Sequence, residues 1–178
     1  MTPHTPAFET QPFDSGWLAL REPFDLAARA DAMAQFDLRA ALGGRATGDD
    51  LHVLDLGCGT ASNFRALAPR LGGTQHWTLV DHDALLLAAL GPALAHWCSS
   101  RGFEWHAEGA SNARIHAADW QATLHWRQAD LRAQLDALPL AECHLVTASA
   151  LLDLVSEEWL IDLLGRAAHA QAAMLFSL

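Results

Sequence analysis

The chain has 178 residues, of which 51% are hydrophobic and 18% are charged, so it can form one compact domain and is too short for two of ordinary size. All 11 basic residues are arginine and they face 21 acidic residues, and the net charge of −10 argues against binding to nucleic acid or anionic lipid. The lack of lysine excludes enzymes that need a lysine Schiff base or a P-loop lysine. The richness in alanine and arginine points to a bacterial source.

Neither a leader nor a membrane span is visible in the sequence, and a cytoplasmic protein is expected. Residues 1–14 lack a basic segment followed by an apolar run, and about 18 consecutive apolar residues occur nowhere. The three cysteines, Cys58, Cys98 and Cys143, lie far apart and form no C-x-x-C motif, which predicts reduced thiols. The histidines show no metal-binding spacing, so no metal site is expected.

Residues 1–50 are expected to be an N-terminal extension followed by a helix. The first 15 residues contain three prolines among polar residues and have little to bury. Residues 23–42 are rich in helix formers, with Pro23 near the first turn and Gly43-Gly44 at the end.

Residues 51–178 alternate between short apolar segments and helical patterns, which predicts an α/β fold with a mainly parallel, doubly wound sheet. A hairpin is expected between residue 103 and the third strand. The expected helices are 62–71, 84–99 with an interruption near Gly91-Pro92, and one that opens at Ser156. The expected core strands are 51–56, 75–80, 123–128, 143–149 and 172–178.

A glycine turn after the first of these strands is the strongest local signal. Gly57 and Gly59 allow positive φ angles and let a ligand approach the backbone, and a helix begins directly after them. Taken alone, such a turn is also found as a plain strand-to-helix connection. Asp55 lies just before the glycines, where a carboxylate disfavours a pyrophosphate and favours a ligand with a positive charge.

Two more acidic residues follow later strands. Asp81 ends the second strand, where an acidic side chain can accept both hydroxyls of a ribose. Its alternative role is a helix cap, which Asp83 already fills. Asp130 follows the third strand beside Leu131, a position suited to an adenine ring and amino group, although a solvated loop carboxylate explains Asp130 equally well.

Four segments resemble the motifs of class I S-adenosylmethionine-dependent methyltransferases, and the resemblance covers residues 51–178 as a cofactor-binding Rossmann-like domain. Methyl transfer from a sulfonium depends mainly on positioning and needs no dedicated general base, so the catalytic residues stay unassigned. The matching segments are VLDLGCGT (53–60), LVDHD (79–83), QADL (128–131) and HLVTASALL (144–152).

The resemblance implies roles for the residues around the glycine turn. Gly57 and Gly59, with Cys58 between them, would flank the methionine part of S-adenosylmethionine. Asp55 would help to hold its amino group. Arg21 would pair with its carboxylate, although a solvated arginine is an alternative.

The same resemblance assigns the nucleoside end of the cofactor to later motifs. Asp81 would bind the ribose hydroxyls, and His82 would lie against the adenine. Asp130 and the backbone of Leu131 would read the adenine edge. Thr147 would offer backbone contacts near the methionine amine.

The chain departs from the family pattern at two places. Ala61 stands where the family usually has a third glycine. Five core strands can be placed before the sequence ends, so the sheet is expected to lack the last two strands of the family. Either the sequence is a fragment, which is the preferred interpretation, or a minimal variant pairs its open edge strand with another chain.

The resulting hypothesis is a methyltransferase that acts on a small-molecule acceptor. Residues 147–150 read Thr-Ala-Ser-Ala rather than the Asn/Asp-Pro-Pro-aromatic pattern of amino-group methylation, which argues against nucleic acid as the acceptor. Asp153 is a weak candidate for catalysis, because a carboxylate at a helix start has a structural explanation. The alternatives are a cofactor-binding module without turnover and a nicotinamide-dependent oxidoreductase; Ser62 and Asp55 both disfavour the latter.

Overall fold

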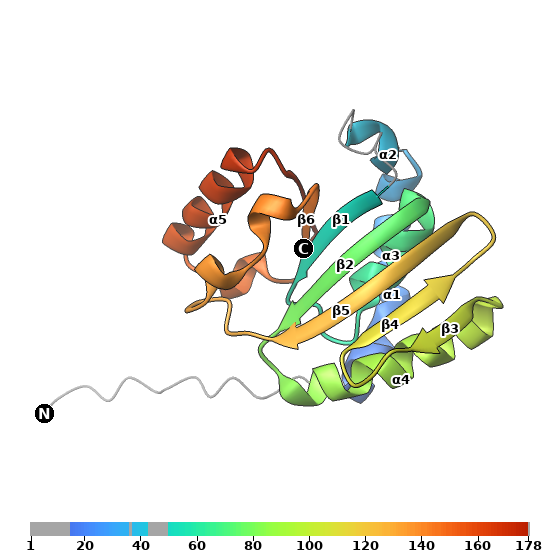
Figure 1. The fold of residues 1–178 in the computed structure, drawn as a ribbon. Helices are drawn as coiled ribbons and strands as arrows, with labels where there is room; N and C mark the ends of the chain where they lie inside the picture. The colour runs from blue at the N-terminus through green and yellow to red at the C-terminus, as the bar shows by residue number, and fades with distance from the viewer. Residues whose placement is uncertain (1–14, 36, 43–49, 178) are drawn as a thin grey trace, which may run out of the picture.

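The computed structural model describes residues 15–35, 37–42 and 50–177, and its centre is a seven-stranded sheet (Figure 1). The strand order is β3-β4-β5-β2-β1-β6-β7, and the five strands from β5 to β7 run parallel. The strands are β1 (Asp50–Leu56), β2 (Gly73–Asp81), β3 (Glu104–Ala107), β4 (Asn112–His116), β5 (Trp120–Gln128), β6 (Leu145–Ser149) and β7 (Ala173–Ser177).

Helices cover both faces of the sheet, as the doubly wound topology requires (Figure 1). On one face, α3 (Ser62–Leu71) and α4 (Ala84–Arg101) bury a core that includes Phe64 and Trp77. On the other face, α5 (Glu157–His169) packs Leu163 against a core that includes Leu54. Since Val53 and Leu54 belong to opposite cores, Asp55 faces the α3 side.

The chain order of the strands creates a switch point between β1 and β6. After β1 the chain forms β2, then the hairpin of β3 and β4 at the edge of the sheet and β5 beside β2, and it then returns to place β6 on the other side of β1. Ligands of open α/β sheets bind at the carboxyl ends of the strands at such a point. The connection from β5 back to β6 contains two short 3-10 helices, η2 (Leu135–Ala137) and η3 (Leu140–Glu142).

The structure confirms the predicted α/β fold with a doubly wound, mainly parallel sheet. The five expected core strands and the hairpin are present, and α3 has the predicted bounds. Seven strands are nevertheless present, because the hairpin of β3 and β4 extends the sheet beyond β5. The expectation that the last two strands of the family pattern are lacking concerns strands other than β3 and β4, and it stays a prediction.

Two helix predictions were wrong. Residues 23–42 do not form one helix; the chain has α1 (Ser15–Ala34) and the short α2 (Leu38–Ala41), and Pro23 lies inside α1. Contacts of the first turns of α1 with the glycine turn, described below, stabilise helix on the N-terminal side of this proline. In addition, α4 continues without interruption through Pro92, because one lost hydrogen bond is outweighed by its five buried side chains.

None of the helices in the described ranges is both long enough and apolar enough to cross a lipid bilayer. The predicted extension at residues 1–14 lies outside the described residues.

Candidate functional site

The predicted glycine loop, residues 57–60, connects the end of β1 to α3. Gly57 and Gly59 have φ angles of 66° and 52°, in the left-handed region that glycine adopts without strain. Ala61 also has a positive φ, 67°, although it carries a Cβ and is buried. Ala61, where the sequence comparison of motifs led us to expect a glycine, therefore has a glycine-like backbone conformation, at a steric cost.

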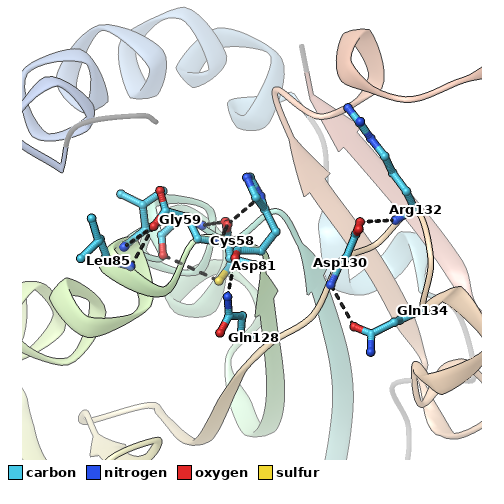
Figure 2. Close-up of polar contacts among 11 residues, drawn as sticks. Cys58, Gly59, Asp81, Leu85, Gln128, Asp130, Arg132 and Gln134 are labelled. Carbon is cyan, nitrogen blue, oxygen red and sulfur yellow. Dashed lines mark hydrogen bonds and ion pairs between the residues drawn. The ribbon is translucent and has the colours of Figure 1, made fainter. Parts of the chain in front are cut away.

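The side chain of Asp81, the last residue of β2, forms a hydrogen bond with this loop (Figure 2). Its Oδ2 accepts a hydrogen bond from the Gly59 N–H at 2.7 Å, and its Oδ1 accepts one from the Asp83 N–H at 2.9 Å. The side chain of His82 is 76% exposed, with Nδ1 3.4 Å from Asp81 Oδ1. Asp83 caps α4 as predicted, because its side chain accepts the Leu85 N–H.

Three N–H groups of the loop region are used within the protein. Cys58 N–H donates to the carbonyl of Val80, Gly59 N–H donates to Asp81, and Ala61 N–H donates to the carbonyl of Cys58. A phosphate-binding loop needs such groups for the ligand. The arrangement therefore disfavours a pyrophosphate at this loop.

A buried polar cluster lies below the loop on the α3 side of the sheet. Asp55 in β1 and Thr147 in β6 are partners in the strand register, and both are buried. The side-chain amide of Asn63, in the first turn of α3, donates to Asp55 Oδ1 at 2.8 Å and to Thr147 Oγ1 at 2.9 Å. This cluster joins β1, β6 and α3 at the switch point.

The electrostatics of the site favour positive charge. Burial raises the pKa of the Cys58 thiol well above its usual range, and the negative charges of Asp55 and Asp81 raise it further. A thiol flanked in this way stays protonated and gives no thiolate nucleophile. Two carboxylates at the ends of adjacent strands make the site suited to a cation.

Asp130 follows β5 at the same edge of the sheet, in a separate hydrogen-bonded group with Arg132 and Gln134 (Figure 2), and Leu131 is the next residue. Asp130 Oδ1 accepts the Arg132 N–H, and Gln134 Oε1 accepts the Asp130 N–H. The side chain of Leu131 is buried in the α5 core, and its carbonyl accepts the indole N–H of Trp159. Asp130 therefore also shapes the turn that follows β5.

Helix α1 lies against the glycine loop. Leu18 reaches the loop so closely that a Cβ on Gly59 would lie 3.5 Å from its Cδ1. Arg65 of α3 forms a two-pronged ion pair with Glu22 of α1, and its third nitrogen donates to the carbonyl of Thr60 at 2.6 Å. We call this the Arg65–Glu22 clasp, because it joins α1 to the loop.

Arg21, which was predicted to pair with the methionine carboxylate of the cofactor, contacts other residues of α1. Its guanidinium is 3.0 Å from Asp25 and 5.3 Å from the ring centre of Trp17. Asp153 lies in the exposed 3-10 helix η4 (Leu152–Leu154) after β6. Neither residue has a hydrogen bond to the loop among those the structure describes.

The structure thus brings Asp55, Cys58, Asp81 and Thr147 together, with Asp130 on the next strand. Sequence reasoning missed Asn63 and the Arg65–Glu22 clasp. Asn63 had a visible signal, since it shares the spacing of Leu67 and Leu71, which lie on the buried face of α3. The clasp had none, because its partners are 43 residues apart.

A histidine cluster lies at the opposite end of the parallel strands. The ring of His52 stacks on that of His76 with centres 4.8 Å apart, and His144 Nδ1 accepts the His52 N–H. Burial and the two neighbouring imidazoles lower the pKa of His52, against a smaller opposing effect of Asp50 and Glu142. A cavity of about 170 Å³ borders the cluster. Within the described ranges, no three His, Cys, Asp or Glu side chains form a metal-binding group.

Comparison with known proteins gives similarity of structure alone, since no family model and no curated protein sequence matches the chain. An S-adenosylmethionine-dependent methyltransferase from Archaeoglobus fulgidus is 16% identical, with a TM-score of 0.45 over 90% of this chain and 54% of that one. A TehB-like S-adenosylmethionine-dependent methyltransferase from Corynebacterium glutamicum is 16% identical, with a TM-score of 0.43 over 89% and 72%. The large terminase of a thermophilic bacteriophage is 12% identical, with a TM-score of 0.45 over 94% and 39%.

The chain spans about half the length of the first of these structures. At TM-scores below 0.5 these similarities do not identify an activity. Any function must therefore be inferred from the residues of the site.

Proposed function

We propose that this chain binds S-adenosylmethionine at the carboxyl ends of β1, β2, β5 and β6 and transfers its methyl group to a small-molecule acceptor. The observation that carries the proposal is the pair of buried carboxylates, Asp55 and Asp81, on either side of a glycine loop in which the N–H groups of Cys58 and Gly59 donate to acceptors within the protein. This chemistry suits a ligand that carries positive charge and lacks phosphate.

The residues present fit the cofactor. Asp55 would face the ammonium group of the methionine part. Asp81 would accept ribose hydroxyls, because each of its oxygens accepts one protein N–H and a carboxylate oxygen can accept a second hydrogen bond. Asp130 and the Leu131 backbone, at the end of the neighbouring strand β5, would contact the adenine.

S-adenosylmethionine supplies a methyl group on a positively charged sulfur. The task of the protein in such a displacement is to align the acceptor and to exclude water, and no general base is obligatory. Leu18, beside Gly59, and Leu151, which lies 3.4 Å from a Cβ built on Gly57, would provide apolar cover over the loop. The net charge of −10 supports a small-molecule acceptor over a nucleic acid.

Calorimetric titration of the 178-residue chain with S-adenosylmethionine, S-adenosylhomocysteine and NAD tests the proposal. We expect the first two to bind and NAD not to bind. Asp81→Ala should weaken binding of S-adenosylhomocysteine at least tenfold. Asp50→Ala is the matched control, because Asp50 lies at the opposite end of the sheet, at the start of β1.

Turnover requires a second measurement. Formation of S-adenosylhomocysteine during incubation with S-adenosylmethionine and a pooled small-molecule fraction would support methyl transfer. Binding with no product from any acceptor would favour a binding module without turnover. Binding of NAD in place of both adenosyl compounds would refute the proposal.

A further inference from the structure

The side-chain amide of Asn63 makes two hydrogen bonds inside the protein, and both acceptors belong to the switch point of the sheet. The relative exposures of Asp55, Asn63 and Thr147 are 0%, 6% and 1%, so water does not compete for these bonds. The amide nitrogen has two hydrogens, and the Asp55 and Thr147 oxygens at 2.8 and 2.9 Å provide one acceptor for each.

The placement of these residues follows from the strand register. Asp55 and Thr147 are opposite one another on β1 and β6, and both face α3. Asn63 is the second residue of α3 and comes four residues after Gly59. One amide group therefore links the two strands of the switch point to the helix that the glycine loop begins.

Other side chains of similar size do not reproduce this pattern. Aspartate has no N–H group and would place a second carboxylate against Asp55, and leucine would leave the Asp55 Oδ1 without this donor. Asparagine at this position therefore links the buried Asp55 side chain to Thr147 without adding a charge of its own.

We infer that Asn63 is a positioning residue for the amino-acid end of the cofactor, and that it acts by orienting the Asp55 carboxylate toward the ammonium group. This inference rests on the proposed function. It predicts selectivity: loss of Asn63 weakens binding of ligands that carry the amino-acid group and leaves the nucleoside end unaffected. A residue that merely stabilises the fold would weaken binding of all ligands alike.

The test compares S-adenosylhomocysteine with 5′-methylthioadenosine, which keeps the adenine, ribose and thioether but lacks the amino-acid group. In Asn63→Ala we expect the Kd of S-adenosylhomocysteine to rise at least tenfold and that of 5′-methylthioadenosine to change less than twofold. Asn112→Ala, which makes the same change on β4 in the hairpin, should alter neither Kd.

Thr147→Val is the second variant, because it removes one acceptor of the amide and leaves the Asp55 bond in place. It should weaken S-adenosylhomocysteine about threefold, again with 5′-methylthioadenosine unchanged. It decides the question if Asn63→Ala does not fold. Equal weakening of both ligands, or no weakening of S-adenosylhomocysteine, would overturn the role of Asn63. Failure of the unmodified chain to bind either ligand would instead refute the proposed function, and the inference with it.

Discussion

Removal of the Arg65–Glu22 clasp should loosen α1 from the glycine loop. The side chains of Arg65 and Glu22 are 7% and 18% exposed, so both charges are largely removed from water. Arg65 also holds the Thr60 carbonyl, which ties the same guanidinium to the loop. Three charge-assisted hydrogen bonds thus converge on one side chain.

The magnitude follows from this burial. An exposed ion pair contributes about 0–1 kcal/mol, whereas hydrogen bonds to charged groups in protected positions contribute about 1.5–3 kcal/mol. For the two-pronged pair we expect a coupling energy of about 1.5–3 kcal/mol. Loss of this free energy would raise the equilibrium constant for local opening of α1 by a factor of roughly 10 to 100.

A double-mutant cycle with Glu22→Ala, Arg65→Ala and the double variant measures this coupling from urea denaturation. Hydrogen exchange of residues in α1 reports the local opening directly. The matched control is the same cycle at Arg21 and Asp25, an ion pair on the same helix that is 45% and 33% exposed and should couple by less than about 0.5 kcal/mol. Equal coupling in the two cycles would show that burial of the clasp gives it no added strength.

Four further predictions follow from single features. Ala61→Gly should change the free energy of unfolding, measured by urea denaturation, by less than about 1 kcal/mol. Relief of the left-handed backbone strain stabilises the folded chain, and this gain offsets the loss of the buried methyl group and the greater conformational entropy of the unfolded chain. Ala61→Val should cost more than about 2 kcal/mol. Because the pKa of His52 is lowered in the folded chain, the unfolded chain takes up a proton at higher pH than the folded chain does. The contribution of His52 to stability should therefore be full above pH 6.5 and fall as the pH drops below it. In a pH series of thermal melts, His52→Asn should flatten this fall, and an unchanged slope would rule His52 out. Burial raises the pKa of Cys98 to about 11 and that of Cys143 to about 12. Alkylation of both thiols by iodoacetamide at pH 8, followed by mass spectrometry, should therefore be at least tenfold slower in the folded chain than in the unfolded chain. Equal rates in the two states would contradict this. We propose that the 178-residue chain self-associates through β7, an edge strand without charged residues. Light scattering should show less self-association in Met174→Lys, which places a charge on this strand. An unchanged mass distribution would exclude β7 as the site of self-association.

Local patterns were enough to predict the segments that form the floor of the site. The strand, the glycine loop and α3 are contiguous in sequence, so their residues carry a complete signal over residues 51–71. The acidic ends of β1 and β2 could be placed together because parallel strands put their carboxyl ends at one edge. The roles of the predicted cofactor-binding residues, and the cytoplasmic location, stay predictions.

The contacts that complete the site could not be predicted because they join distant parts of the chain. Asn63 and Thr147 are 84 residues apart, and Glu22 and Arg65 are 43 apart. The start of α1 could not be predicted for the same reason, since local rules place Pro23 at a helix start and long-range contacts of α1 extend the helix past it. The sequence shows that Ala61 departs from the glycine of the methyltransferase motif, but only the structure shows that Ala61 has a positive φ.

The choice between a phosphate ligand and a cationic one depends here on where the N–H groups of the loop region point. A glycine loop at the start of a helix is suited to phosphate when its N–H groups point toward the ligand. In this chain Gly59 donates instead to the carboxylate of Asp81, and a second carboxylate, Asp55, is buried nearby. Burying a carboxylate costs stability that an apolar side chain at the same position would not, and such departures from good packing are expected at functional sites. Under the proposed function, the ammonium group of the cofactor would offset the cost that Asp55 imposes on the unliganded fold, and the ribose hydroxyls would bind to Asp81.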